Sequence, residues 1–236
     1  MVNKFQHRSS ETEMLDNTDI QVELLHKNLG ELDFINRVLG GRAISIKGIK
    51  KLVTDKNKRY HIVDLGCGSG DTLQGVAKWA RANGYLVELT GVDFNPDAIN
   101  YLVRHCRDYP EIRGVALDYR DFLKSGTPVD IIHCSLFCHH LKDEELEELL
   151  NFCRLSSKTG FIINDLHRHW IAYYGVKIIT NLLRGSKLSK NDGPVSVLCA
   201  FKRIELHKII QKVQITNYSV SWKWVFRFLI VGYNEE

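Results

Sequence analysis

Short apolar segments alternate with segments of helical periodicity through the middle of the chain, and this order constrains the fold more than any other feature. The apolar segments are 59–65, 86–93, 113–118, 129–135 and 160–166, and the helical segments among them include 72–84, 95–106 and 142–155. Strands that alternate with helices of this length form βαβ units around a parallel sheet. The strands are nearly continuous apolar runs, as expected when helices cover both faces of the sheet. The sequence therefore predicts an α/β fold whose ligand lies beyond the carboxyl ends of the strands.

The segment before this core is predicted to be helical. Apolar residues between Ile20 and Leu39 recur at spacings of three, four or seven, which is typical of an amphipathic helix. Gly40 and Gly41 then end the pattern. We therefore expect an N-terminal helical segment, residues 1–58, in front of a core at 59–166.

Two further segments follow the core, and the whole chain, 1–236, is predicted to be one domain. Residues 167–196 combine an aromatic stretch with a basic loop, which predicts a cap inserted after the fifth strand. Residues 197–236 predict a helix and a β-hairpin. Large aromatic residues alternate in this hairpin, and we expect them on a buried strand face: Trp222, Trp224, Phe226 and Phe228. The alternative is a tryptophan that contacts the substrate.

Composition argues against several classes of partner. The 236 residues carry 32 Lys and Arg against 28 Asp and Glu, without a block of like charges, so we expect no nucleic-acid partner. No stretch approaches 18 apolar residues and the first residues lack a signal-peptide core, so we expect a cytoplasmic protein without a membrane partner. Six cysteines in such a chain are expected to be free thiols.

A glycine-rich turn, "VDLGCGSGD" at 63–71, follows the first predicted strand. A dinucleotide fingerprint would need a glycine at position 71, where Asp71 stands. Asp93 lies 23 residues after Gly70, at the end of the next strand, where a carboxylate can accept hydrogen bonds from both hydroxyls of a ribose. Asp64 and Asp71 would repel a pyrophosphate. The pattern therefore favours a cationic nucleoside with an ammonium and a sulfonium.

At these residues the chain resembles a known family. "VDLGCGSGD", "GVDFNPDAI" (91–99) and "CSLFCHHL" (134–141) look like class I S-adenosylmethionine-dependent methyltransferases. "NDLHRH" (164–169) and "NDGPVSVLCAF" (191–201) are similar to bacterial small-molecule methyltransferases, some of which accompany polyketide-type biosynthesis. The resemblance implies a Rossmann-like, mostly parallel sheet with an antiparallel strand in the C-terminal hairpin. It also implies S-adenosyl-L-methionine as the cofactor.

The resemblance further implies which residues contact this cofactor. It assigns the amino group of the cofactor to Asp64, its methionine and ribose portion to the backbone of Gly66, Gly68 and Gly70, and its methionine end to Ser135. It assigns the ribose hydroxyls to Asp93 and the adenine to Phe94, Asp118 and Tyr119. These nine residues are the expected cofactor site.

The segment "HCSLFCHHL" at 133–141 is unusually rich in cysteine and histidine. Cys134 and Cys138 have a spacing that zinc sites use, but the segment offers no separate second pair, so we predict no metal. In the resembling family a His-His step at this place begins the helix beside the pocket. His139 and His140 are therefore either part of a helix start or part of the substrate pocket.

The same segment disfavours one kind of acceptor. Family members that methylate amino groups of nucleic-acid bases or glutamine often carry two prolines in this position. The chain has Ser135-Leu136-Phe137-Cys138 instead. The resemblance therefore argues against that chemistry.

A second histidine cluster, "NDLHRHWIAYY" at 164–174, leaves the fifth strand at the ligand edge. His167 is a candidate base, because histidine can accept a proton near neutral pH. Arg168 is a candidate for gripping a carboxylate or phenolate, with His169 and Tyr173 as further substrate contacts. The alternative is a surface loop with incidental basic residues. Together with His140, His167 completes the pair of predicted catalytic residues.

We expect a methyltransferase in which a small-molecule acceptor attacks the sulfonium methyl in line, with catalysis supplied mainly by alignment and exclusion of water. O-methylation of an aromatic or polyketide-like molecule is the leading hypothesis, and C-methylation of a quinone-like ring is its nearest alternative. Two less favoured hypotheses are an NAD-dependent reductase and a noncatalytic cofactor-binding or RNA-associated protein.

Overall fold

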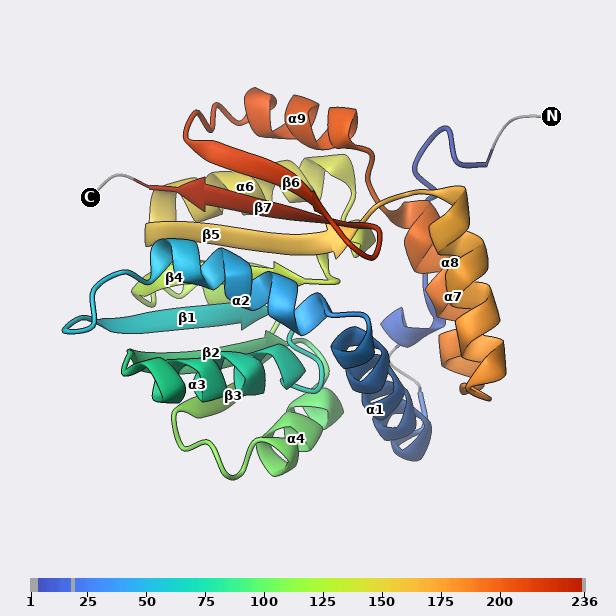
Figure 1. Ribbon diagram of the computed structural model, residues 1–236, viewed down its shortest axis with the longest axis horizontal. Helices are drawn as coiled ribbons and strands as arrows, with labels where there is room; N and C mark the ends of the chain where they lie inside the picture. Colours follow the sequence, from blue (N-terminus) through green and yellow to red (C-terminus); the bar gives the residue numbers. More distant parts are fainter. Residues whose placement is uncertain (1–3, 18–19, 235–236) are drawn as a thin grey trace.

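The computed structural model describes residues 4–17 and 20–234 and contains one seven-stranded sheet (Figure 1). The strand order is β3-β2-β1-β4-β5-β7-β6. The strands are β1 (Arg59–Leu65), β2 (Leu86–Asp93), β3 (Ile112–Ala116), β4 (Val129–Ser135), β5 (Ser157–Leu166), β6 (Tyr218–Lys223) and β7 (Arg227–Tyr233). Only β7 runs against its neighbours, pairing antiparallel with β5 and β6. The predicted Rossmann-like sheet with an antiparallel hairpin strand is confirmed.

Helices cover both faces of the sheet and also form a layer beside it (Figure 1). They are α1 (Val22–Val38), α2 (Gly41–Leu52), α3 (Asp71–Asn83), α4 (Pro96–His105), α5 (Tyr119–Lys124), α6 (Asp143–Ser156), α7 (Trp170–Leu182), α8 (Lys187–Cys199) and α9 (Arg203–Lys212), with 3-10 turns η1 (Met14–Asp16) and η2 (Cys138–His140).

Alternation along the central strand divides the core into two halves. Ile62 of β1 packs with buried residues of α2, α3 and α4, whereas its neighbour Val63 packs with those of α5, α6 and α9. Successive side chains of a strand point to opposite faces, so each face of the sheet has its own apolar layer. Both layers are fully buried around β1, which fixes the ends of the central strands in place.

The strand order reverses at β1, because β2 and β3 lie on one side of it and β4 and β5 on the other, and this determines where a ligand can bind. β1 pairs with β2 on one side and with β4 on the other, and Leu65 is in register with both Val92 and Cys134. The carboxyl ends of the three strands therefore lie at one edge, at the switch point where ligands bind in open α/β sheets.

The N-terminal segment contains two helices where the sequence predicted one. α1 agrees with the predicted helix, but α2 begins at Gly41, directly after it. Gly40 has φ +76°, a left-handed conformation that side chains disfavour. The glycine pair is thus a sharp corner between two helices, and α2 packs on β5 and β7.

Two other predictions for the C-terminal part need correction. The basic loop expected before residue 196 is largely helical, because Ser186 caps the start of α8 through a bond from the Ser189 N–H. The hairpin turn lies between β6 and β7, so the aromatic alternation is interrupted there. Trp222 and Trp224 are 41% and 71% exposed, and the buried strand face does not extend to them.

The six cysteines are free thiols, as predicted, and the structure buries all of them. Among residues 4–17 and 20–234, no helix is both long and apolar enough to cross a bilayer.

Candidate functional site

A cavity of about 390 Å³ lies at the carboxyl ends of β1, β2 and β4, where α1 and η1 also contribute to its wall. Eight of the nine predicted cofactor residues line it: Asp64, Gly66, Gly68, Asp93, Phe94, Asp118, Tyr119 and Ser135. His140 lines the same cavity. The structure therefore brings one predicted catalytic residue to the predicted cofactor residues.

The glycine loop has two different functions in the fold. Gly66 and Gly68 border the cavity with φ of +67° and +49°. A Cβ on Gly66 would lie 2.3 Å from the Phe137 ring. Gly70, the predicted cofactor residue that does not line the cavity, stands at the N-cap of α3, and a Cβ there would lie within 3.0 Å of Leu102 and Cys106. Gly70 serves the turn, whereas Gly66 and Gly68 leave room beside the cavity.

Asp93 is held in a fixed orientation at the end of β2. Its Oδ2 accepts a hydrogen bond from the Gly68 N–H and its Oδ1 accepts one from the Asn95 N–H, both at 3.0 Å. Burial raises the pKa of this carboxyl. Each oxygen keeps a further lone pair for a donor such as a ribose hydroxyl. The neighbouring Phe94 ring is 49% exposed and offers an apolar surface at the same place.

Asp64 is oriented by a buried chain of hydrogen bonds. Its Oδ1 lies 2.7 Å from His133 Nδ1, and His133 Nε2 lies 2.9 Å from Ser45 Oγ. Asn164 donates to the same Ser45 oxygen at 2.9 Å. The first histidine of the cysteine- and histidine-rich segment thus supports Asp64, and Ser45 on the unpredicted α2 completes the support.

The cavity wall is strongly acidic. Its carboxylates are Asp16, Asp33, Asp64, Asp71, Asp93, Asp118 and Glu145, and the basic side chains among the lining residues are Arg120 and His140. Burial raises the pKa of Asp71 even though Asn36 donates to its Oδ2 at 2.7 Å. Charges in such a site repel one another unless a cation lies among them. A ligand carrying an ammonium and a sulfonium fits this wall, and a pyrophosphate does not.

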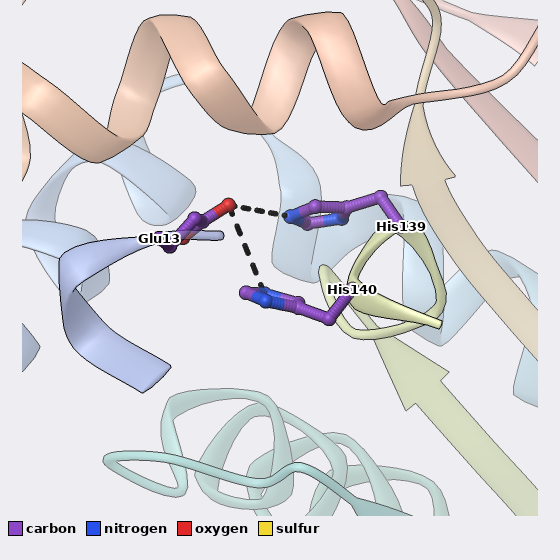
Figure 2. Close-up of side chains that lie close together, drawn as sticks. All are labelled: Glu13, His139 and His140. Carbon is purple, nitrogen blue, oxygen red and sulfur yellow. Dashed lines mark ion pairs between the residues drawn. The ribbon is translucent and has the colours of Figure 1, made fainter. Parts of the chain in front are cut away.

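The two adjacent histidines of η2 point to a shared carboxylate (Figure 2). Oε1 of Glu13 lies 3.3 Å from His139 Nε2 and 3.9 Å from His140 Nε2. On their other sides, His139 Nδ1 lies 2.7 Å from Asp165 Oδ1 and His140 Nδ1 lies 3.1 Å from Asp16 Oδ1. No local sequence pattern singles out these three carboxylates, although Asp165 stands in the segment "NDLHRH".

His139 is buried and does not line the cavity, unlike His140. Burial alone would lower the pKa of His139, but the charges of Asp165 and Glu13 outweigh it and raise the pKa to about 10. The predicted substrate contact of His139 is therefore not direct. It belongs to the structure behind the cavity wall.

His167, the other predicted catalytic residue, lies away from the cavity lining. Its Nδ1 accepts a hydrogen bond from the Trp222 indole at 3.3 Å, and its ring packs on Phe228. Burial, together with the charges of His169 and Arg168, lowers its pKa to about 4. The structure places His167 beside the hairpin tip.

Arg168, expected to grip the substrate, is fully buried and pairs with Glu205 on α9. Its Nη1 lies 3.0 Å from Glu205 Oε2, and its other donors bond the backbone oxygens of Ala200, Phe5 and Gln6. These bonds occupy the guanidinium inside the protein. The expectation is corrected, because the side chain ties the N-terminal segment to the core.

The remaining predicted substrate residues lie in the same outer region. His169 caps α7 by accepting the Ile171 N–H at 3.2 Å, and the Tyr173 ring packs on Phe5. Neither residue lines the cavity, and neither does any other residue of 167–196. The predicted cap packs beside the N-terminal segment (Figure 1). The expectation that it covers the ligand directly is therefore corrected.

The fold and the cavity define an open α/β protein with a ligand site at the carboxyl ends of its central strands, and comparison with known proteins adds a family. Residues 62–160 match the family model of the methyltransferase domain. A ubiquinone biosynthesis O-methyltransferase of Coxiella burnetii is 27% identical over 147 residues, which is 59% of this chain and 58% of the relative. The match thus spans less than two thirds of the relative's own length.

Solved structures share the fold at low sequence identity. The plantazolicin methyltransferase BpumL in complex with SAH aligns with a TM-score of 0.65 at 15% identity, covering 91% of this chain and 98% of that one. Human N-acetylserotonin methyltransferase in complex with SAM aligns with a TM-score of 0.63 at 14% identity, covering 92% of this chain and 57% of that one. The match to the methyltransferase domain family lies within residues 62–160, and the solved structures show that the whole chain shares the fold of S-adenosylmethionine-dependent methyltransferases.

Proposed function

We propose that this chain methylates an oxygen of a small aromatic or polyketide-like molecule. The observation that carries the proposal is a single cavity that contains both the cofactor loop and His140 with its partner Asp16. The similarity to a ubiquinone biosynthesis O-methyltransferase supports an aromatic acceptor and an oxygen as the methylated atom.

The cofactor residues divide according to the parts of the ligand that they would hold. Asp93 would accept the ribose hydroxyls and Phe94 would contact the adenine, because both lie at the end of β2 on the cavity wall. Asp64 and the acidic wall would hold the positive charges. S-adenosyl-L-methionine supplies an electrophilic methyl group when bound there.

The acceptor would occupy the part of the cavity formed by α1 and η1. Leu25, Leu29 and Leu32 of α1, with Leu15 of η1, give this wall an apolar surface. Such a surface favours an aromatic ring by removing apolar area from water. Excluding water also protects a reactive methyl donor from hydrolysis.

Activation of the acceptor oxygen is assigned to His140. It lines the cavity, Asp16 accepts from its Nδ1 side, and its Nε2 faces Glu13 Oε1 at 3.9 Å. An imidazole with one nitrogen fixed by a carboxylate has a defined tautomer and orientation. The arrangement is that of an orienting carboxylate behind a catalytic imidazole.

An acceptor screen tests this function. Purified protein is incubated with S-adenosylmethionine carrying a deuterated methyl group and with a panel of phenols, catechols, aromatic acids and quinols. We expect a labelled methyl ether from at least one phenolic acceptor, with the position established by NMR. A labelled C–CH₃ product, or transfer only to amines, would contradict O-methylation.

A further inference from the structure

We propose that Glu13, His139 and His140 form a binding site for a divalent transition-metal ion at the acceptor end of the cavity. Their candidate ligand atoms all lie within 4.8 Å of one another, and the shared Glu13 Oε1 is 3.3 and 3.9 Å from the two Nε2 atoms (Figure 2). Ligand atoms roughly 2.1 Å from one ion are themselves about 3.0–3.4 Å apart, so a small movement would seat an ion.

The surroundings of the two imidazoles are those of metal ligands. Each ring has a carboxylate on its Nδ1 side, Asp165 for His139 and Asp16 for His140, and turns its Nε2 toward Glu13. Asp165 is itself fixed by the N–H groups of His139 and Leu166, at 3.1 and 2.7 Å. Carboxylates that orient metal-ligating histidines in this way set the tautomer and strengthen the ligand.

The charge of the cluster also calls for a cation. Glu13 and Asp165 are buried, and Asp16 is partly buried. Among the residues that the structure describes, these three carboxylates form ion pairs only with His139 and His140. Because three carboxylates surround two imidazoles, the group keeps a net negative charge whatever the protonation of the rings, and burying that charge without compensation is costly. One divalent ion supplies the compensation and suits the donor set, because two imidazoles and a carboxylate bind first-row transition metals.

The sequence-based prediction that the chain binds no metal considered only cysteine ligands, Cys134 and Cys138, within one segment. The cluster contains no cysteine, and its third ligand comes from a residue more than a hundred positions earlier in the chain. Three protein ligands leave coordination positions open, and His140 borders the cavity.

The role of the ion rests on the proposed function. An acceptor hydroxyl bound to the ion would lose its proton to water, since a cation stabilises the oxyanion left behind. His140 would then activate the acceptor by holding the ion and would not take the proton itself. The acceptor class is accordingly a phenol or enol whose oxygen reaches the ion at the apolar wall.

Metal titration of untagged, chelator-treated protein tests the site without relying on activity. Calorimetry with Zn²⁺ and Mn²⁺, and the visible absorption of added Co²⁺, should show one bound ion per chain. Glu13→Gln and His140→Ala should each weaken binding by about tenfold or more. His207→Ala, which changes a histidine on α9, should leave it unchanged.

The results separate this proposal from the function. Circular dichroism and S-adenosylmethionine binding show that each variant is folded. The metal site is overturned if the folded wild type binds no ion, or if Glu13→Gln and His140→Ala bind the ion as tightly as the wild type does. Either result leaves methyl transfer to be judged by the acceptor screen. Metal binding without any acceptor turnover overturns the proposed function and leaves the site in place.

Discussion

His140 Nδ1 lies 3.1 Å from Asp16 Oδ1, although 124 positions separate the two residues in the chain. Asp16 belongs to η1, and the same short segment supplies Glu13 to the other side of the histidine pair. The segment is anchored by Asp192 of α8, whose carboxylate accepts the N–H groups of Met14 and Leu15 at 2.9 Å. The N-terminal segment thus completes the part of the cavity wall that we propose for the acceptor.

Asp16→Asn should impair the chemical step, because the amide no longer holds the imidazole in the same tautomer. We expect kcat to fall about tenfold to a hundredfold. The KM for S-adenosylmethionine should change little, since the predicted cofactor contacts lie elsewhere on the wall. Steady-state kinetics with the acceptor found in the screen measures both.

The matched control is Asp108→Asn, which changes an exposed carboxylate whose side chain is 82% accessible. It should have wild-type kinetics. A loss confined to the KM for the cofactor in Asp16→Asn would show that Asp16 belongs to the cofactor site.

Gly66→Ala should weaken cofactor binding. The added methyl group would lie 2.3 Å from the Phe137 ring, and the left-handed φ of +67° adds about 1 kcal/mol of strain. Calorimetry should show S-adenosylmethionine affinity reduced by about tenfold or more. That fold-change corresponds to roughly 1.4 kcal/mol.

Gly84→Ala separates strain from steric conflict. Gly84 has a similar φ of +71°, but a Cβ there would meet nothing within 4 Å. Backbone strain in this variant should lower the free energy of unfolding by a similar amount, and the variant should bind the cofactor as the wild type does. If both variants bind S-adenosylmethionine as the wild type does, the glycine loop is not part of the cofactor site.

Arg168→Met should destabilise the protein and leave acceptor specificity unchanged. It removes a fully buried guanidinium, leaves Glu205 without its partner and releases the backbone oxygens of Phe5 and Gln6. Loss of one partner of a buried pair predicts a decrease of about 3 kcal/mol in the free energy of unfolding.

Urea denaturation measures this loss, with Arg107→Met, on a side chain 81% exposed, as the control. The KM for the acceptor is measured in parallel. A stable Arg168→Met variant with a raised acceptor KM would restore the substrate role that the sequence suggested.

His167 should make stability depend on pH in the acidic range. Its folded pKa of about 4 lies below the ordinary histidine value, so the folded state favours the neutral ring. This contribution is fully present above a pH of about 6.5 and is lost as the pH falls from there through about 4. His167→Gln should therefore lose less unfolding free energy than the wild type between these values.

The comparison uses urea denaturation at several pH values, with His207→Gln as the control. The same His167→Gln variant should retain its turnover and the shape of its pH–rate profile. A flattened profile would return His167 to the role of catalytic base.

The fold was predictable because it depends on local patterns. The apolar runs of β1 to β5 and the helices between them carry their periodicity in adjacent residues, and Asn95 with Pro96 marks the start of α4 as the structure has it. α2 was missed because a glycine pair that ends one helix also begins the next. α8 was missed because Gly193 and Pro194 lie within it and suggest a loop.

The gathering of the proposed cofactor residues at one cavity was predictable for a similar reason. Its residues stand at strand ends, and the topology of parallel strands brings strand ends together. The part of the cavity proposed for the acceptor depends on tertiary contacts between η1, η2 and α1, which no local pattern reveals. Arg168 was misassigned because a basic residue between two histidines has the same sequence pattern whether it faces a ligand or Glu205.

The most direct measurement is calorimetric titration with S-adenosylmethionine, S-adenosylhomocysteine and NAD, performed on the wild type, Asp93→Ala and Asp108→Ala. Micromolar binding of the two adenosyl ligands to the wild type and Asp108→Ala, lost in Asp93→Ala, with no binding of NAD, is the result we predict. Binding of NAD in preference to the adenosyl ligands, or adenosyl binding that survives in Asp93→Ala, would contradict the site described at the end of β2.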